Sequence, residues 1–379
     1  MFIANLLAAL RERGHEMRIV SRVDARDFWR GRLPARRLIA EAALVRGDMK
    51  RFSPDAWLVY AASVQYPDLF GWWQRPRRYV LLGCEGSRTS RVMALPRPWR
   101  EIFTFAHRQS LKRAHKIVGV RPGAVEDYRR WGVPEERICF LPLGIKTWTR
   151  IPCREEARRV LGLPQEAPIV LCVSRLAVRS GKDDRVPSKT EAILDLLRAF
   201  AELPANVLLL LVGDGLGRPQ LEQEAERLKL AGRVQFAGAV EHGDVSWFYA
   251  ASDFFAFPEK AEGNRPYQAL LEAQACGRPV VTMQTALAQM TVEAGRTGLL
   301  ARDLNELPAH LLTLAQDRNL CDEMGRAGAA FVARSFSIEA RARQIEELLL
   351  GSRDVSTGET QQQASPQRGE RAEASLIKT

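Results

Sequence analysis

The sequence predicts an α/β protein with two domains, each built around a parallel β-sheet. The chain has 379 residues, enough for two domains with separate cores. Short apolar runs alternate with helical segments of about 10–15 residues, the order expected of βαβ units. A stretch with little apolar periodicity, 146–166, contains Pro152 and Pro164 and separates the two halves.

The first half, 1–148, predicts one such domain. It begins with an amphipathic helix that ends at Gly14, a residue suited to a helix terminus. Compact apolar runs then indicate buried parallel strands, and periodic segments indicate helices. The expected strands are 17–21, 57–61, 78–82, 116–120 and 138–143, and the expected helices are 2–13, 100–114 and 122–131.

The second half, 165–335, repeats the alternation more strongly. A separate helix is expected at 336–351. The tail 352–379 has almost no large apolar residues, so we expect it to be disordered. The expected strands are 168–174, 207–212, 233–237, 253–257, 279–282 and 298–301, and the expected helices are 189–203, 218–230, 243–251, 266–276, 304–316 and 318–333.

The composition is that of a globular protein, with 46% hydrophobic and 27% charged residues. No run of 18 apolar residues occurs, so we expect no transmembrane helix. Arg11 and Arg13 follow the first apolar run instead of preceding it, which argues against a signal peptide. Six scattered cysteines without Cys-x-x-Cys spacing indicate free thiols and a cytoplasmic location.

The charge is unevenly divided along the chain. Residues 1–150 contain 29 Lys and Arg against 14 Asp and Glu, whereas the remainder contains 27 against 31. A basic first half suggests an anionic partner, such as a membrane surface or a lipid-linked phosphate. Nucleic acid is disfavoured because no stacking aromatic platform accompanies the basic residues. An arginine-rich composition without a partner is the alternative.

Candidate binding residues follow the strands of the second half, where ligands of a doubly wound sheet bind. After strand 168–174 come Arg175 and, beyond a long charged loop, Lys189. A guanidinium and an ammonium suit a diphosphate, although two solvated surface charges would look alike. After the next strand, Gly213, Asp214 and Gly215 form a tight turn that allows close backbone approach.

A second group of candidates lies between strand 253–257 and the next helix. Glu262, Gly263 and Asn264 precede a helix that opens near Pro266, and the start of a helix favours anions. Glu272 lies six residues into that helix. On the sheet-facing side its carboxylate would need partners, which two ribose hydroxyls would supply; an exposed helix glutamate is the alternative.

The fixed order of these motifs resembles the retaining GT-B glycosyltransferases of family 4. The motifs run SRL, K, VGDG, V-x-F-x-G, Y-x-x-x-D-x-F, EG, LLEA-x-A-C-G-x-PVV and TGLL, over most of residues 168–345. The resemblance implies two Rossmann-like domains facing across a cleft. It also implies transfer of a sugar, with retention, from a nucleotide-sugar donor to a glycan or lipid-linked acceptor in cell-envelope polysaccharide biosynthesis.

The resemblance implies roles for the candidate residues in binding the donor. Arg175 and Lys189 match the pair that neutralises the donor diphosphate, so neither a metal nor another cofactor is expected. Gly213, Asp214 and Gly263 match further donor-binding positions. Glu272 matches the second carboxylate of the E-x7-E element, which binds the ribose.

The same resemblance nominates three residues for catalysis. The first carboxylate of the E-x7-E element falls at Asn264, and Glu262 stands two residues earlier. The histidine that the family often carries after a strand of its first domain falls in Tyr79–Gly86, where Glu85 is the candidate. We therefore expect Glu85, Glu262 and Asn264 near the reacting sugar.

The chain starts inside what matches the family's first helix, so the first domain is expected to lack its first strand and the glycine-rich loop after it. A truncated start or a degenerate family member would both give this pattern. The alternative function is therefore a GT-B protein that binds a nucleotide or sugar without catalysis. A sugar-nucleotide epimerase is disfavoured by the family-4-like order of motifs. Peripheral contact with the inner face of an anionic membrane is expected for an active enzyme.

Overall fold

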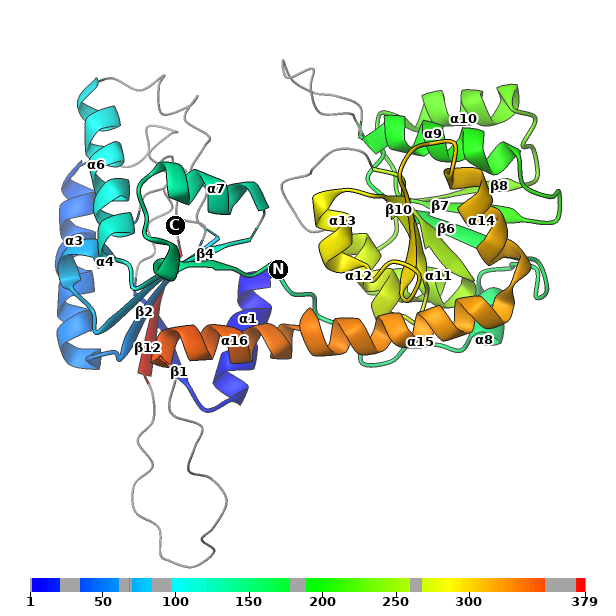
Figure 1. The fold of residues 1–379 in the computed structure, drawn as a ribbon. Helices are drawn as coiled ribbons and strands as arrows, with labels where there is room; N and C mark the ends of the chain where they lie inside the picture. The colour runs from blue at the N-terminus through cyan, green and yellow to red at the C-terminus, as the bar shows by residue number, and fades with distance from the viewer. Residues whose placement is uncertain are drawn as a thin grey trace, which may run out of the picture. The chain divides into compact units, whose positions relative to one another are not determined.

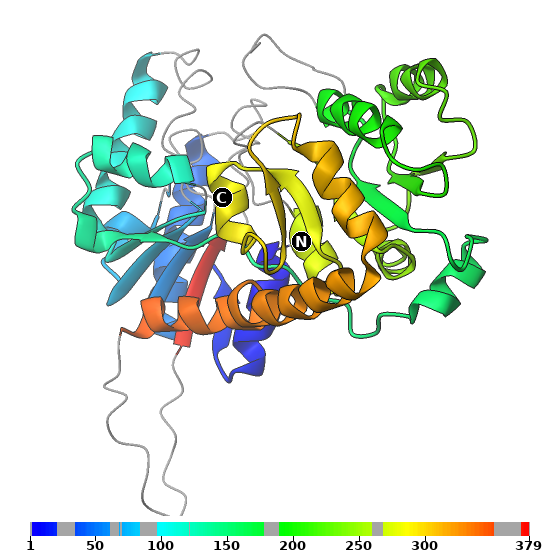
Figure 2. The same cartoon turned by 45° about the vertical axis from the view of Figure 1, so that its right-hand side comes forward.

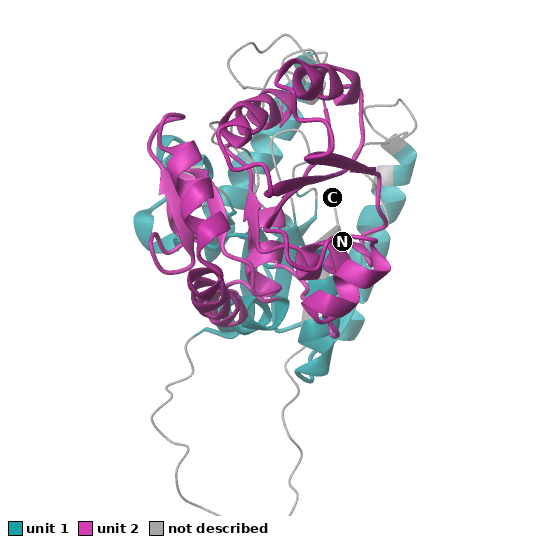
Figure 3. Ribbon diagram, turned by 90° about the vertical axis from the view of Figure 1, so that its right-hand side faces the viewer, with its two compact units in different colours: residues 1–144, 338–379 teal, residues 145–337 magenta. Residues whose placement is uncertain are grey.

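A computed structural model describes residues 2–20, 35–60, 68, 70–83, 97–120, 122–177, 189–259, 268–351 and 373–378. The chain divides into two compact units, shown in separate colours in Figure 3. Unit 1 comprises Met1–Gly144 and Ile338–Thr379, and unit 2 comprises Ile145–Ser337. Each contains a six-stranded sheet in which the paired strands are parallel, so the predicted α/β class with two parallel-sheet domains is confirmed.

Unit 1 is a sheet with strand order β1-β12-β2-β3-β4-β5 and helices on both faces (Figure 1). Its strands are β1 (Glu16–Ile19), β2 (Ala56–Tyr60), β3 (Arg78–Leu82), β4 (Lys116–Gly119), β5 (Ile138–Phe140) and β12 (Glu373–Lys378). Its helices are α1 (Phe2–Glu12), α3 (Ala35–Phe52), α4 (Gly71–Gln74), α6 (Arg97–Arg113), α7 (Pro122–Arg130) and α16 (Ile338–Leu350), with a 3-10 turn at Glu135–Arg137.

Alternation along the strands of unit 1 divides the core into two layers. Leu58 and neighbouring side chains pack with α1 and α16 on one face, while Trp57 and Val59 pack with α3, α6 and α7 on the other. Both faces are therefore covered, as a parallel sheet requires. The prediction from buried apolar runs holds for β2, β3 and β4, whose side chains are almost all buried.

The chain's last described segment completes the first sheet. Strand β12 lies between β1 and β2 and pairs in parallel with both, with Ser375 opposite Arg18 and Trp57 (Figure 2). These six residues differ from the expectation of a disordered tail, and they occupy the place beside β1 where the sequence predicted a missing strand. The physical reason is that an unfilled gap would leave the facing backbone groups of β1 and β2 without partners.

Unit 2 has strand order β11-β10-β9-β6-β7-β8. Its strands are β6 (Ile169–Val173), β7 (Leu208–Val212), β8 (Val234–Gly238), β9 (Phe254–Ala256), β10 (Val280–Met283) and β11 (Gly298–Ala301). Its helices are α8 (Arg154–Val160), α9 (Lys189–Ala201), α10 (Arg218–Arg227), α11 (Val245–Ala251), α12 (Gln268–Ala275), α13 (Ala286–Thr291), α14 (Leu307–Gln316) and α15 (Arg318–Ser335).

The strand order of unit 2 reverses direction between β6 and β9. From β6 the chain runs outward through β7 to β8, then returns to β9 on the other side of β6 and continues to β10 and β11. Because such crossovers are right-handed, the connecting helices on the two sides of this point cover opposite faces. The reversal is a topological switch point, where open α/β sheets form a ligand crevice at the strands' carboxyl ends.

A buried ion pair fixes the start of unit 2. The Arg158 guanidinium, fully buried, donates from Nη2 to Asp253 Oδ2 at 2.8 Å and from Nε to the carbonyl of Ala251 at 2.8 Å. The same Asp253 oxygen accepts from the backbone N–H of Ile169 at 2.7 Å, and Arg154 pairs with Oδ1 at 2.5 Å. Helix α8 is thereby attached to the amino end of β6.

Four helices were not anticipated from the sequence: α3, α4, α8 and α13. Helix α3 buries only a narrow stripe, with Val45 inside and Ala42 and Met49 partly covered, among many charged residues. Helix α8 lies in the stretch 146–166 that lacks apolar periodicity, and its buried Arg158 is polar. A weak apolar period conceals a helix when tertiary contacts supply its stability.

Two further observations concern the described part of the chain. None of its helices combines the length and the apolar content needed to span a membrane. Five cysteines are free thiols: Cys172, Cys276 and Cys321 are buried, Cys139 is half-buried and Cys153 is exposed.

Candidate functional site

The loop that leaves β6 is held against the turn that leaves β7. The N–H of Ser174 donates to the carbonyl of Val212 at 2.9 Å, and the N–H of Leu176 donates to the carbonyl of Asp214 at 3.0 Å. The N–H of Gly217 then donates to the carbonyl of Leu176 at 2.8 Å. These bonds fix the backbone on either side of Arg175.

Glycine is required where these two segments meet. Gly213 has φ +130°, and a Cβ on it would lie 1.9 Å from the carbonyl oxygen of Ser174. Gly215 has φ +153°, and its Cβ would lie 2.4 Å from the carbonyl oxygen of Leu176. The turn thus places backbone, without side chains, beside the β6 loop.

The first turn of α9 joins the same cluster. The Thr190 hydroxyl donates to the carbonyl of Ala177 at 3.0 Å, which ties the start of the helix to the end of the β6 loop. A Cβ on Gly217 would lie 2.1 Å from Thr190 Oγ1, so the β7 turn packs tightly against α9. The contact brings Lys189, the first residue of α9, to the carboxyl end of β6.

Arg175 and Lys189, the predicted diphosphate ligands, are both exposed beside this cluster. Burial raises the pKa of Glu259, in the loop after β9, and the positive charge of Lys189 partly opposes that rise. Lys189 likewise opposes the rise that burial causes in the pKa of the Cys172 thiol, in β6. Lys189 therefore lies near the ends of both β6 and β9, the two strands that flank the switch point. Glu259 was missed in the sequence; its position three residues before Glu262 was the available signal.

The Asp214 side chain stabilises the turn in which it lies. Its Oδ1 accepts from the N–H of Gly215 at 2.7 Å, and its Oδ2 lies 3.7 Å from the guanidinium of Arg218, which donates to Glu222 at 2.7 Å. The carboxylate is half-exposed, at 48%, so it neutralises Arg218 while it holds the turn between β7 and α10.

Glu272 faces the interior of unit 2. Its side chain is 7% exposed, and its Oε2 accepts from the Tyr249 hydroxyl at 3.2 Å. Burial raises the pKa of Glu272 to about 7, and the Tyr249 hydrogen bond opposes that rise. The alternative of a solvated helix glutamate is thereby excluded, and the carboxylate has capacity for further hydrogen-bond donors.

The remaining predicted site residues, Glu85, Glu262, Gly263 and Asn264, lie outside the described residues, as does Pro266. The described part of α12 begins at Gln268. Within the described ranges, no group of three or more His, Cys, Asp or Glu side chains is arranged to hold a metal ion.

Two family models match the chain. The model described as "Glycosyl transferases group 1" matches residues 167–317, which cover unit 2 from before β6 to α14. The model described as "Glycosyl transferase 4-like domain" matches residues 1–144, the first segment of unit 1.

Curated relatives match parts of the chain. A GDP-mannose-dependent monoacylated alpha-(1-6)-phosphatidylinositol monomannoside mannosyltransferase of Corynebacterium glutamicum is 31% identical over 220 residues, 55% of this chain and 55% of that protein. The lipopolysaccharide core biosynthesis glycosyltransferase LpsE of Rhizobium meliloti is 31% identical over 197 residues, 51% of this chain and 52% of its own length. The chain thus spans little more than half of each of these relatives.

Solved structures share the fold. WaaG, a glycosyltransferase involved in lipopolysaccharide biosynthesis, has a TM-score of 0.57 and 18% identity, covering 92% of this chain and 95% of WaaG. Sucrose-phosphate synthase from Thermosynechococcus elongatus has a TM-score of 0.57 and 23% identity, covering 83% and 79% of the two chains. The likenesses to these solved structures show the GT-B fold, and the family matches over both units show that the chain belongs to the group 1 glycosyltransferases.

Proposed function

We propose that this protein transfers a sugar from a nucleotide-sugar donor to a glycan or lipid-linked acceptor of the cell-envelope type, with retention at the anomeric carbon. The observation that carries the proposal is the assembly at the switch point of unit 2. There the β6 loop, the glycine turn after β7 and the start of α9 are bonded together, with Arg175 and Lys189 exposed beside them. Ligands of open α/β sheets bind at such a point.

The donor diphosphate is assigned to Arg175 and Lys189. A guanidinium fork and an ammonium neutralise the charge that develops on the leaving diphosphate, so the transfer is proposed to need no metal. Gly213 and Asp214 are assigned to the donor site because their turn packs its backbone against the β6 loop that carries Arg175. Gly263 extends the donor site on the β9 side.

The ribose is assigned to Glu272 and the sugar to the loop before α12. A buried carboxylate that accepts from the Tyr249 hydroxyl can also accept from two ribose hydroxyls. Glu85, Glu262 and Asn264 are proposed to act on the transferred sugar. The acceptor side is supported by the relatives, among them an enzyme named for a phosphatidylinositol mannoside and one named for lipopolysaccharide core biosynthesis.

Nucleotide binding by two alanine variants tests the donor site. Arg175→Ala and Lys189→Ala should each weaken binding of GDP or UDP by about 10- to 100-fold, because each removes a charge-assisted contact to phosphate. Both nucleotides are used because one relative is named GDP-mannose-dependent and a neighbour, Anabaena HepE, was solved with UDP. Titration calorimetry provides the measurement.

Lys229→Ala is the matched control, since it removes an exposed cation just beyond the carboxyl end of α10. If the native chain binds a nucleotide and neither Arg175→Ala nor Lys189→Ala weakens binding more than Lys229→Ala, the diphosphate assignment is wrong.

Binding without catalysis is the second candidate function. It is favoured by Asn264, which stands where the E-x7-E element has a carboxylate. Hydrolysis of GDP-mannose and UDP-glucose, followed by NMR of the released sugar with and without EDTA, separates the two functions. Nucleotide binding with no release from any donor in a wider panel, and no transfer to lipid acceptors, would favour the non-catalytic protein.

A further inference from the structure

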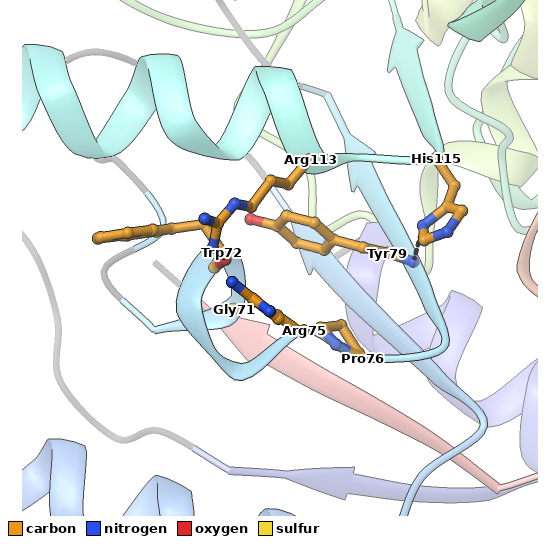
Figure 4. A pocket seen from close by; sticks show the side chains of 7 residues that line it. All are labelled: Gly71, Trp72, Arg75, Pro76, Tyr79, Arg113 and His115. Carbon is orange, nitrogen blue, oxygen red and sulfur yellow. Dashed lines mark hydrogen bonds between the residues drawn. The ribbon is translucent and has the colours of Figure 1, made fainter.

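A pocket in unit 1 lies at the opposite edge of the sheet from the strands' carboxyl ends. It has a volume of about 290 Å³ and is lined by Gly71, Trp72, Arg75, Pro76, Tyr79, Arg113 and His115 (Figure 4). These residues come from α4, the amino end of β3, and the connection from α6 to β4. The nucleotide site proposed above lies in unit 2, at the carboxyl ends of its strands. The pocket in unit 1 is therefore a separate site.

The pocket wall is held in place from behind. The buried Asp68 carboxylate accepts from the N–H groups of Phe70 and Gly71, both at 2.9 Å, and from the Tyr79 hydroxyl at 2.5 Å. These bonds fix the start of α4 against β3 and occupy both oxygens of Asp68. The pocket is therefore preorganised, and this carboxylate faces its own donors.

The lining of the pocket is mostly apolar, and its few polar groups are hydrogen-bond donors. Arg113 donates to the carbonyl of Trp72 at 2.5 Å and lies over the Trp72 ring at 5.6 Å, which positions its guanidinium at the rim. Arg75 ends α4 in the left-handed conformation, at φ +52°, and no described carboxylate pairs with it. His115 Nδ1 accepts from the N–H of Tyr79 at 3.1 Å, so the neutral ring carries its proton on Nε2. Such a set fits an anion with several acceptor oxygens.

Exposed apolar side chains adjoin the pocket. Phe105 is 54% exposed and meets Trp72 edge to face at a centroid distance of 5.7 Å. Ile102, one helical turn away on α6, is 49% exposed, and Trp73 on α4 is 37% exposed. Arg108 is exposed on α6 within a turn of Phe105, and Lys112 is exposed one turn farther along the helix. Helix α3, on the same face of the sheet, exposes further apolar residues, Ile39 and Leu44.

We infer that this surface is the part of unit 1 that contacts an anionic phospholipid bilayer, with Arg75 and Arg113 taking the phosphate of one lipid headgroup in the pocket. The inference deepens the membrane-proximal acceptor of the proposed function and rests on it. Phe105, Ile102 and Trp73 would enter the headgroup and upper acyl region, as apolar side chains of interfacial helices do. The basic excess of the first half, 29 cations against 14 anions, provides the matching charge.

The arginines of the pocket and the adjoining exposed apolar side chains together identify the partner. A free phosphate would bind the arginines but would not contact the exposed side chains of Phe105 and Ile102. A protein partner would not require two arginines at a pocket beside these apolar side chains. A bilayer offers phosphates and acyl chains together.

The test uses the full chain and sedimentation with vesicles of phosphatidylcholine alone or with phosphatidylglycerol added. Binding should require phosphatidylglycerol. Arg75→Asn should weaken partitioning about fivefold, since one cation near an anionic surface is removed. Asparagine tolerates the left-handed backbone at this position. Phe105→Ser should weaken binding further, by about 10-fold, through lost apolar burial.

Two matched controls separate this surface from general charge and hydrophobicity. Lys229→Asn removes a cation from a left-handed position, φ +56°, in unit 2, and Val160→Ser removes an exposed apolar side chain of α8. Neither should change partitioning. Equal loss in Arg75→Asn and Lys229→Asn, or equal binding to both kinds of vesicle, would overturn the inference.

Two further readouts complete the test. Saturable binding of inorganic phosphate that depends on Arg75, with no binding to vesicles, would assign the pocket to a soluble phosphate and overturn the lipid surface. GDP and UDP binding are measured on the same preparations. Absent vesicle binding with intact nucleotide binding rejects only the membrane surface, whereas the reverse result rejects only the donor site.

Discussion

At the scale of single residues, Glu272 reduces the stability of unit 2 at neutral pH. Its pKa is raised from 4.5 to about 7 because its carboxylate is buried with the Tyr249 hydroxyl as partner. Folding is thus favoured by the protonated form, and that contribution is fully present below pH 4.5 and is lost as pH rises through about 7. A ligand that brings hydroxyl donors to this carboxylate would recover the loss.

Glu272→Gln should therefore stabilise the ligand-free protein at pH 8 by up to about 3 kcal/mol, the equivalent of the pKa shift. Near pH 4.5 the variant and the native protein should be nearly equal. The same change should weaken nucleotide binding, because an amide accepts fewer ribose hydroxyls than a carboxylate. Urea unfolding at both pH values measures the first effect.

Glu226→Gln, at an exposed position on α10, is the control and should have the same small effect at both pH values. A Glu272→Gln protein that is less stable than the native one at pH 8 would contradict the conclusion that the buried carboxylate destabilises the ligand-free protein.

At the scale of secondary-structure elements, Arg158 and Asp253 connect α8 to the sheet of unit 2. The Arg158 side chain is fully buried and also donates to the carbonyls of Pro164, Gln165 and Ala167. Removing the cation would leave these acceptors and Asp253 under-satisfied in a low-dielectric interior.

Arg158→Ala should lower the free energy of unfolding of unit 2 by about 3–5 kcal/mol. Arg198→Ala is the control: Arg198 pairs with Asp195 and Glu224 but is 54% exposed, so its loss should cost less than about 1 kcal/mol. Urea denaturation followed by the fluorescence of Trp247 and other tryptophans measures both. Equal costs for the two variants would mean that the buried network is not an anchor.

At the scale of the whole molecule, the first sheet joins segments from both ends of the chain. Strand β1 and strand β2 pair with β12, not with each other, so the pairing of β1 with the rest of the sheet depends on residues 373–378. Helix α16 adds a second such connection, since Glu346 pairs with Arg13 and His15.

Leu376→Pro should disrupt unit 1 selectively. Proline has no N–H for the ladder and is excluded from central strands. Hydrogen exchange at the amides of β1 and β2 should rise by at least about 10-fold, while the amides of β6 and β7 stay protected. Leu376→Val keeps the strand backbone and is the control. Identical protection of β2 in the two variants would show that β12 does not pair there.

The sequence by itself determined much of the fold and part of the candidate site. Runs such as 57–61, 78–82 and 168–174 are apolar enough to specify buried strands, and their alternation with helices specified two parallel sheets. The glycines at Gly213 and Gly215 marked a turn because no other residue meets that backbone geometry. These signals are local, so they can be seen without the tertiary structure.

The tertiary structure decided the features that depend on distant partners. Strand β12 is specified by the open place between β1 and β2, and the buried face of Glu272 is specified by Tyr249, 23 positions earlier. Arg158 is defined by an aspartate 95 positions away. The pocket in unit 1 joins α4, β3 and α6, whose residues show no common pattern in the sequence. Periodicity records only which face of an element is apolar, and the folded chain determines which partners meet it.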